Sequence, residues 1–205
     1  MPRWAMARCF GDGDPLYERY HDVEWGLVPA IGPDERELLE RLILEAFQSG
    51  LSWLTILRKR EAFRAAFAGF DPARVAAFGE DDVARLLADA AIVRNERKIR
   101  AAITNARALL ALHDSGERLW DLLAAHGPPR EDGARHRIWA EVPGSTPGSA
   151  ALATALKSRG FVFIGPTTAY ATLQAVGIVD DHLADCPVVA ARAQAENARS
   201  AGGRR

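Results

Sequence analysis

The chain has 205 residues, a formal net charge of −1, 48% hydrophobic residues and 26% charged residues. This length and composition predict one soluble globular domain with a sizeable core. The sequence holds no run of about 18 apolar residues, which excludes a membrane-spanning helix. Two cysteines are too few for a four-cysteine iron–sulfur cluster.

Charge is unevenly distributed along the chain. Residues 1–50 carry five basic and ten acidic side chains, whereas residues 51–110 carry eleven basic and seven acidic ones. A locally positive segment can face phosphate groups, although ordinary solvated helix faces explain the same pattern. The first thirty residues lack the apolar core of a secretory signal, so we expect a cytoplasmic protein.

Helical patterns dominate the chain. Residues 34–49 place Leu38, Leu42 and Glu45 on one face, which predicts an amphipathic helix. Capping residues, prolines at first helical positions and alanine-rich stretches indicate further helices. These cover 52–68, begin near residues 71 and 80, and cover 94–112, 149–159 and 167–174.

The remaining segments suggest a loop and a tail. Residues 127–148 hold four prolines and four glycines and predict a long surface loop. The chain after Cys186 turns into Ala, Arg and Gly, which suggests a frayed end. Without an alternating β pattern, the fold class is all-α. We expect a single domain over residues 1–190 and a flexible tail over 191–205.

A short apolar turn lies between the last two predicted helices. Gly160 and Gly165 bracket this turn, and it leads directly into a helix N-terminus. The free amides of a helix N-terminus bind phosphate without a lysine, and glycines let the backbone approach closely. A DNA-binding turn and a buried connector both fit this segment.

The only two cysteines lie at opposite ends of the chain, each with a histidine partner. On a helix, His182 and Cys186 would share one face and could bind one ion. Cys9 and His21 are too far apart for that argument. Two thiolates and two imidazoles would fill a structural zinc site and leave no position for water. The alternatives are buried cysteines with core histidines, or a Cys9–Cys186 disulfide, which no secretory signal supports.

Glu45 is the polar residue on the apolar face of the 34–49 helix, which also carries Leu38 and Leu42. A buried carboxylate without a partner is costly, so it should have a dedicated hydrogen-bonding role. A glutamate at the edge of the apolar stripe is the alternative interpretation.

Short motifs spread over residues 9–186 form a specific pattern when taken in order. They are Asp14-Pro15-Leu16-Tyr17, Tyr20-His21-Asp22, Glu24-Trp25-Gly26, Leu44-Glu45, Gly50-Leu51-Ser52-Trp53, Asp89-Ala90 with Ile92 and Arg94, Lys157-Ser158-Arg159-Gly160-Phe161 with Phe163 and Gly165, and Asp181-His182. Together they resemble the 3-methyladenine DNA glycosylase I family of helix-hairpin-helix repair enzymes. The resemblance covers nearly the whole chain.

This resemblance implies a helix-hairpin-helix glycosylase fold in which one structural zinc ion joins the N- and C-terminal segments. It also implies an enzyme that flips 3-methyladenine out of double-stranded alkylated DNA and excises it. Glu45 matches the family residue that hydrogen-bonds the excised base and is our catalytic candidate. Tyr20 matches a second hydrogen-bonding group, and Trp53 matches the ring that stacks on the base. Trp25 and Phe10 would complete the aromatic walls.

The resemblance also assigns DNA contacts. The loop with Gly50 and Leu51 would supply groups that fill the gap left by the flipped base, where an apolar wedge offsets lost stacking. Leu51 can equally be a core leucine. The glycine-bracketed turn would contact DNA through Gly160, Gly165, Thr167 and Thr168. Further phosphate contacts, or only a solvated helix face, come from Arg94, Arg97, Lys98 and Arg100.

Two positions depart from the family pattern. The sequence has Cys9-Phe10-Gly11 where the family suggests Cys-Gly-Trp, which leaves the role of Phe10 open. Asp180 stands where an asparagine is expected. Other helix-hairpin-helix glycosylases carry a carboxylate near this place that stabilises positive charge on the sugar. We hypothesise that Asp180 is a neutral replacement and not an added catalytic group.

Residues 160–168 contain no lysine, the nucleophile with which bifunctional glycosylases cleave the strand. The sequence therefore favours a monofunctional hydrolase. We expect a monomer, although no sequence feature sets the oligomeric state. A helix-hairpin-helix module that binds DNA without cutting it is the competing hypothesis. A zinc hydrolase is a weak alternative, because no His-Glu-x-x-His motif occurs and four protein ligands would close the metal site.

Overall fold

The computed structural model describes residues 8–28, 34–128 and 135–202. Within these ranges the backbone forms helices and no β-strand, which confirms the all-α prediction. None of the described helices is long and apolar enough to cross a membrane. In chain order the elements are α1 (Pro15–Val23), α2 (Glu35–Gln48), α3 (Trp53–Ala66), η1 (Ala68–Phe70), α4 (Pro72–Ala76), α5 (Glu80–Ala88), α6 (Glu96–Asp114), α7 (Leu119–Ala124), η2 (Trp139–Glu141), α8 (Pro147–Ser158), α9 (Pro166–Ala175) and α10 (Pro187–Gly202).

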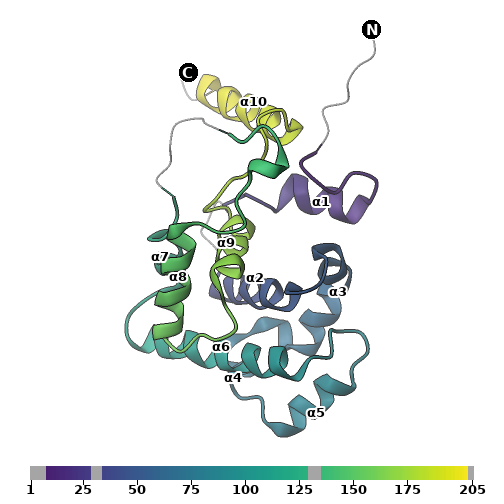
Figure 1. The fold of residues 1–205 in the computed structure, drawn as a ribbon, viewed down its shortest axis with the longest axis vertical. Coiled ribbons are helices and arrows are strands. Elements are labelled where there is room, and N and C mark those ends of the chain that lie inside the picture. The colour runs from purple at the N-terminus through teal and green to yellow at the C-terminus, as the bar shows by residue number, and fades with distance from the viewer. Residues whose placement is uncertain (1–7, 29–33, 129–134, 203–205) are drawn as a thin grey trace.

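Helix α2 is the centre of the fold. Every residue from Leu38 to Phe47 is buried, because α3, α6, α7 and α9 pack around the helix. The amphipathic pattern of the sequence predicted one buried face, so the burial of α2 goes further than expected. Figure 1 shows α2 and α9 in the middle, with α1 and α10 at one end and α4, α5 and α6 towards the other.

Segments from the two ends of the chain lie side by side. The Arg192 guanidinium on α10 donates to the backbone oxygens of Trp25 and Gly26, at 3.3 Å each. The Leu183 amide donates to the Cys9 sulfur at 3.1 Å. The segment after α1 is therefore tied directly to the C-terminal part of the chain.

Local capping explains where the helices begin. The Asp34 carboxylate caps α2, the Asn95 side chain caps α6 and Thr146 forms a capping box at α8. The sequence analysis missed α1 and α7. Helix α1 carries the same signal that was used near residue 71, an N-capping aspartate (Asp14) followed by Pro15 at the first helical position.

The C-terminal segment differs from the predicted flexible tail. Residues Pro187–Gly202 form helix α10, so the helix over 167–174 is not the last one. Proline at the first helical position and the alanine content that follows both favour a helix. Residues 203–205 of the predicted tail lie outside the described residues, as do residues 1–7 of the predicted domain.

The long segment 127–148 is only partly the predicted surface loop. Residues 129–134 lie outside the described ranges, η2 covers Trp139–Glu141, and α8 begins within the segment at Pro147. The Trp139 ring packs against Phe10 and Trp25, with ring centroids 5.7 and 6.1 Å apart. Part of this segment therefore contributes to the packing around α1.

Gly177 lets the end of α9 approach the segment after α1. Its φ is +75°, and a Cβ atom there would lie 2.2 Å from the Leu27 carbonyl carbon. Gly116 has a similar φ of +83° but open space around it. We expect Gly116→Ala to cost about 1–2 kcal/mol from the left-handed backbone alone. Gly177→Ala should cost roughly twice that or more, because the backbones must also separate. Urea unfolding of both variants measures this, and equal losses would contradict the close approach.

Candidate active site and metal centre

An aromatic cluster lies between α1 and α3. Tyr20 and Trp25 are buried with Leu57, and Phe10, Tyr17 and Trp53 pack against them. The Tyr20 and Trp53 ring centroids are 5.2 Å apart, and those of Phe10 and Trp25 are 4.9 Å apart. The structure thus brings together the four aromatic residues named from the sequence, Phe10, Tyr20, Trp25 and Trp53.

The sequence analysis missed two aromatic members of this cluster. Tyr17 packs against Phe10 in a tilted arrangement with ring centroids 5.0 Å apart. Trp139 packs on Phe10 and Trp25 while remaining 47% exposed. A tryptophan inside a proline- and glycine-rich polar segment was the available signal, because binding residues are common on loops.

Three charged residues of α2 are buried, and their surroundings differ. The Glu40 carboxylate accepts hydrogen bonds from Arg60 and Arg64. The Arg41 guanidinium donates to the Ala175 carbonyl and to Glu37. Glu45 is only 6% exposed, yet its carboxyl group has no hydrogen-bond partner within the described ranges. Glu45 is therefore the one of these three side chains without a hydrogen bond. Elsewhere on α2, both carboxylate oxygens of Glu35 are also buried without a hydrogen bond, although Glu35 lies 3.1 Å from the His113 Nε2 atom.

Burial shifts the pKa values of two neighbouring side chains, Glu45 and Tyr20. Burial raises the pKa of Glu45 to about 8, and the nearby charge of Arg41 opposes the shift. Burial also raises the pKa of Tyr20 well above its usual value, and the charge of Glu45 adds to that rise. Glu45 and Tyr20 are thus electrostatic neighbours. Near neutral pH the Glu45 carboxyl is largely protonated in the free protein.

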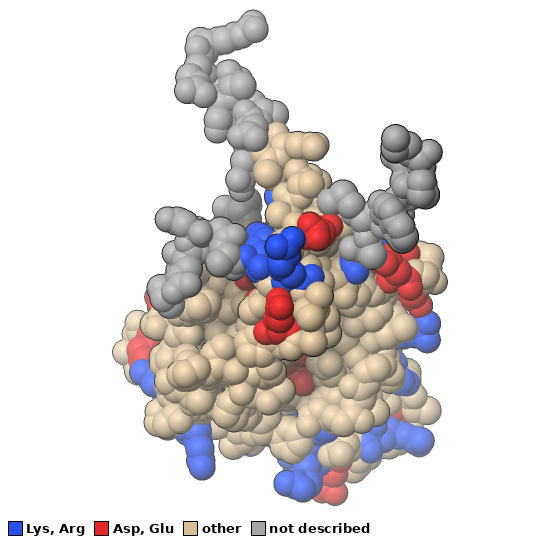
Figure 2. Space-filling view, turned by 45° about the horizontal axis from the view of Figure 1, so that its top comes forward, with Lys and Arg blue, Asp and Glu red and all other residues tan. Residues whose placement is uncertain are grey.

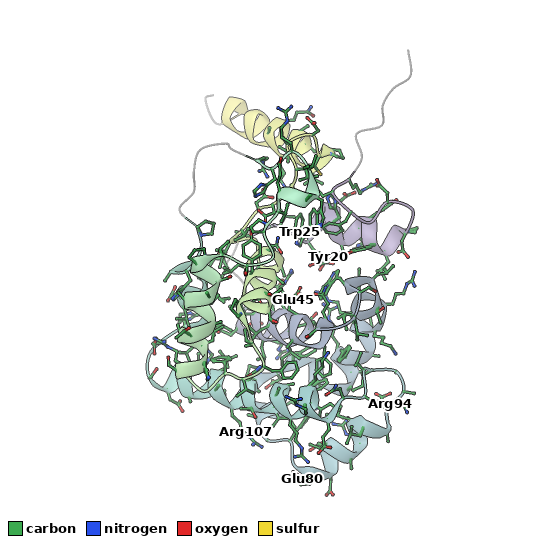
Figure 3. All side chains as sticks on the ribbon, in the orientation of Figure 1. Tyr20, Trp25, Glu45, Glu80, Arg94 and Arg107 are labelled. Carbon is green, nitrogen blue, oxygen red and sulfur yellow. The ribbon has the colours of Figure 1, made fainter. Side chains whose placement is uncertain are left out.

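Two further polar groups of the cluster lack partners. The Trp53 indole nitrogen is buried and unpaired among the described residues, and the Tyr20 hydroxyl has no partner there either. Figure 3 shows Tyr20, Trp25 and Glu45 around one space between α1 and α2. Polar groups that gather without protein partners are candidates for contact with a ligand.

The loop after α2 is short and tightly held. Gly50 has a φ of +82°, and the Leu51 amide donates to the Gln48 carbonyl at 2.6 Å. The Ser52 hydroxyl then caps α3 by accepting from the Thr55 amide. The Leu51 side chain is 41% exposed, which excludes the alternative of a core leucine. Leu51 therefore projects from a rigid turn that follows Glu45 closely in the chain.

The glycine-bracketed turn connects α8 and α9. Gly160 has a φ of +85° and Phe163 a φ of +62°. The fully buried Asn105 side chain on α6 accepts from the Val162 amide at 2.8 Å and donates to the Val162 carbonyl at 3.1 Å. Phe161 is buried, whereas Val162 and Phe163 are exposed. The turn is therefore anchored at its base and apolar at its surface.

The end of this turn exposes a helix N-terminus. Gly165 is the N-cap of α9 and offers no side-chain cap, and Pro166 occupies the first helical position. The amides of Thr167 and Thr168 belong to the first turn of α9, where a helix carries partial positive charge. This geometry suits an anion.

The basic residues of α6 are mostly engaged within the protein. Arg100 pairs with Glu80 and Glu96, and Lys98 is buried. Arg97 lies over the Phe163 ring at 5.9 Å, and Arg94 is exposed. Figure 2 shows that Lys and Arg side chains on the face it presents form small groups, several beside acidic ones. The positive middle segment of the sequence therefore does not translate into a continuous basic surface on that face.

Three of the four predicted metal ligands converge. The ligand atoms of Cys9, His21 and Cys186 lie within 4.8 Å of one another. The Cys186 sulfur lies 3.6 Å from the His21 Nε2 atom, and sulfur and nitrogen ligands of one tetrahedral zinc ion are also about 3.6 Å apart. The His182 ring packs against the His21 ring with centroids 4.8 Å apart. Two free cysteines are present, and the structure shows no Cys9–Cys186 disulfide.

Carboxylates orient both imidazoles. The His21 Nδ1 atom lies 2.8 Å from Asp22, and the His182 Nδ1 atom lies 2.6 Å from Asp180. A carboxylate on one ring nitrogen is the usual environment of metal-binding histidines and leaves the other nitrogen for a metal. The His21 Nε2 atom faces the Cys186 sulfur, whereas the His182 Nε2 atom lies 3.4 Å from the His21 backbone oxygen. Asp180 also accepts from Arg135 and Arg192. These contacts assign Asp180 to the support of His182, consistent with a replacement that is neutral for catalysis.

These features define a helical protein with a cluster of aromatic side chains, polar groups without hydrogen-bond partners beside it, and two anchored surface turns. A family model for methyladenine glycosylases matches residues 10–190. The chain belongs to this family.

Similar proteins cover most of the chain. DNA-3-methyladenine glycosylase 1 of Escherichia coli is 46% identical over 182 residues, which is 88% of this chain and 96% of that protein. A crystal structure of 3-methyladenine DNA glycosylase I has a TM-score of 0.83 at 46% identity and covers 88% of this chain and 98% of its own. A structure of the Staphylococcus aureus glycosylase that addresses 3-methyladenine recognition has a TM-score of 0.81 at 33% identity, covering 88% and 94%.

Glu45 should make folding pH-dependent. Its pKa is about 8 in the folded protein and about 4.5 in an unfolded chain, so the folded state binds the proton more tightly. The stability from this group is complete below pH about 4.5 and is lost as pH rises towards about 8. Relative to Glu45→Gln, the wild type should lose up to about 1.4 kcal/mol per pH unit in this window.

Urea unfolding of both proteins across the window measures this difference. Glu61→Gln, at an exposed position of α3, is the matched control and should follow the wild-type pH dependence. Parallel stability curves for wild type and Glu45→Gln would contradict a buried, proton-binding Glu45.

Proposed function

We propose that this protein is a monofunctional DNA glycosylase that flips 3-methyladenine out of double-stranded alkylated DNA and hydrolyses its bond to deoxyribose. The product is an abasic site, the substrate of later base excision repair. Membership of the methyladenine glycosylase family supports the reaction class. The observation that carries the proposal is the buried Glu45 carboxyl without a protein partner, which lies below aromatic rings that can hold a planar base.

The chemistry requires little acid catalysis from the protein. Adenine methylated at N3 is cationic in the nucleoside, so the bond to the sugar can break with its electron pair going to the base. The base leaves neutral, and water adds to the sugar carbon and releases a proton. The protein must extract the base, hold it and exclude competing orientations.

The pocket residues fit these tasks. Trp53 stacks on the base, and Phe10, Trp25 and Trp139 complete the walls. Tyr20 and Glu45 hydrogen-bond the base edge, where adenine offers an amino donor and ring acceptors. A cationic base lowers the pKa of a neighbouring carboxyl group. Glu45 would therefore release its proton on binding and face the positive base as a carboxylate.

Two surface turns fit the duplex. Leu51 and Gly50 enter the gap left by the flipped base, and the exposure of Leu51 supports this role. The turn between α8 and α9 acts as the hairpin of a helix-hairpin-helix element, with phosphate bound at Thr167 and Thr168 and close approach at Gly160 and Gly165. We further propose that the protein acts as a monomer.

The test is release of free base from methylated duplex DNA. We expect the wild type to release 3-methyladenine and to leave unbroken abasic strands, because residues 160–168 hold no lysine for a Schiff base. Glu45→Gln and Trp53→Ala should each slow excision by about 10²-fold or more, the range of other positioning and polar active-site groups. Arg85→Gln, on α5, is the control.

Free base is quantified by chromatography and strand breaks by gel electrophoresis. DNA binding by the wild type without any base release would show the non-catalytic binding module instead. Strand cleavage, or borohydride trapping of a covalent adduct, would contradict a monofunctional reaction.

We also propose a structural zinc ion at Cys9, His21, His182 and Cys186. The spacing of Cys186 and His21 and the carboxylate on each imidazole support this assignment. When bound, zinc would supply a cross-link between the two ends of the chain. Trp25 lies beside the proposed ligands, because the centroids of the Trp25 and His182 rings are 4.6 Å apart. The metal ligands would thus brace one wall of the base pocket.

Removing one thiolate tests the metal. We expect Cys186→Ser to lose most bound zinc and to lower the melting temperature, because zinc binds only the folded site. Metal content by mass spectrometry and thermal unfolding measure the two effects. Ser158→Ala, on the exposed C-terminal turn of α8, is the control. Unchanged zinc content and melting temperature in Cys186→Ser would exclude a structural metal at these residues.

A further inference from the structure

Lys98 on α6 holds the loop that carries Gly50 and Leu51. Its ammonium donates to the backbone oxygen of Phe47 at 2.9 Å and to that of Ser49 at 2.6 Å. The side chain is buried and has no acidic partner within the described ranges. An ammonium group committed to two carbonyls fixes the path of the chain just before Gly50.

The position of Lys98 also matters electrostatically. The last carbonyls of a helix lack intrahelical partners and carry partial negative charge. Helix α2 has no basic residue in its last turn, so Lys98 from α6 supplies the missing positive charge. Without it, the end of α2 would present bare carbonyls to an approaching phosphate backbone.

The same face of α6 holds the second surface turn. Asn105 lies seven residues after Lys98, two helical turns further along. It forms a two-way hydrogen bond with the backbone of Val162. Helix α6 therefore holds both turns through hydrogen bonds between a side chain and the backbone. Lys98 contacts one turn and Asn105 contacts the other.

We propose that Lys98 and Asn105 are positioning residues that set the spacing between the 48–51 loop and the 160–165 turn to fit one DNA duplex. The inference rests on the proposed function, because the two turns act together only on a DNA substrate. Lys98 does not itself contact phosphate in this arrangement. Its role is to hold Gly50 and Leu51 in the conformation that fills the gap beside a flipped base.

The decisive variant is Lys98→Met, which keeps the stem of the side chain and removes the ammonium. We expect single-turnover excision from methylated duplex DNA to slow by about 10-fold or more, because small displacements of positioning groups have large effects on rate. Affinity for free 3-methyladenine, measured by tryptophan fluorescence, should change less than about two-fold, since the pocket walls are untouched.

Salt dependence separates positioning from direct phosphate contact. Loss of one phosphate contact lowers the slope of log K against log salt by about one. We expect an unchanged slope for Lys98→Met, with faster hydrogen exchange confined to the 47–53 peptide. A slope reduced by about one, or excision at the wild-type rate, would overturn the proposal.

Lys59→Met is the matched control. Lys59 also donates to two backbone carbonyls, those of Ala90 and Ala91. Figure 3 shows Arg94, which closely follows that loop, far from Glu45. This variant should keep its excision rate within about two-fold while losing similar stability.

Two further variants complete the test. Asn105→Leu should show the same combination of slow excision and intact free-base binding, and full excision activity in this variant would remove Asn105 from the proposal. Lys98→Gln keeps one donor and gives a milder loss if Lys98→Met does not fold. A wild-type protein that releases no base from DNA would refute the proposed function itself, whereas altered exchange at 47–53 would still report on the anchoring.

Discussion

Burial of α2 on every side is the constraint on which the rest of the structure depends. A helix with Glu40, Arg41 and Glu45 inside a core must satisfy each charge or neutralise it. Glu40 is matched by two arginines of α3 and Arg41 by the carbonyl end of α9, which draws these helices onto α2. Glu45 receives no such partner and is held largely protonated by its raised pKa. The fold thus compensates two buried charges with protein groups and leaves the third without a hydrogen bond, which is the arrangement that the proposed binding of a base requires.

Local signals account for what the sequence predicted well. Caps and apolar spacing located α2, α3, α6, α8 and α9 within a few residues, and the spacing of Leu38, Leu42 and Glu45 placed the carboxyl group on an inward face. Trp139 and Asn105 escaped because their roles arise only from tertiary contacts, one with Phe10 and one with Val162. Helix α10 was missed because its composition resembles that of a disordered end, although Arg192 ties it to Trp25 and Gly26.

The predicted metal site also depends on tertiary contacts that the sequence does not reveal. The sequence analysis paired His182 with Cys186 by helical spacing, but the segment between α9 and α10 that holds them is not helical. Only the fold places the ligand atoms of Cys9, His21 and Cys186 together. The sequence also could not predict which side chains surround the proposed metal ligands. The sequence left Asp180 as either a neutral replacement, which we hypothesised, or an added catalytic carboxylate. In the structure Asp180 contacts His182, Arg135 and Arg192, so it supports one imidazole and links it to α10. A carboxylate with three partners is poorly placed to stabilise charge on a sugar.

Different parts of the chain hold the aromatic walls and the two surface turns in place. The walls of the pocket are braced by the ends of the chain, through His182 beside Trp25 and Arg192 on the Trp25 carbonyl. The surface turns are braced by α6, through Lys98 and Asn105. The two systems meet in the last turn of α2, because Glu45 lies only two residues before Phe47, whose carbonyl Lys98 holds. Lys98 therefore fixes the end of α2 through backbone oxygens and leaves the Glu45 side chain and the aromatic walls untouched. Filling the gap in the duplex and holding the extracted base would then be separate tasks, so a displaced 48–51 loop should slow excision from DNA while binding of the free base persists.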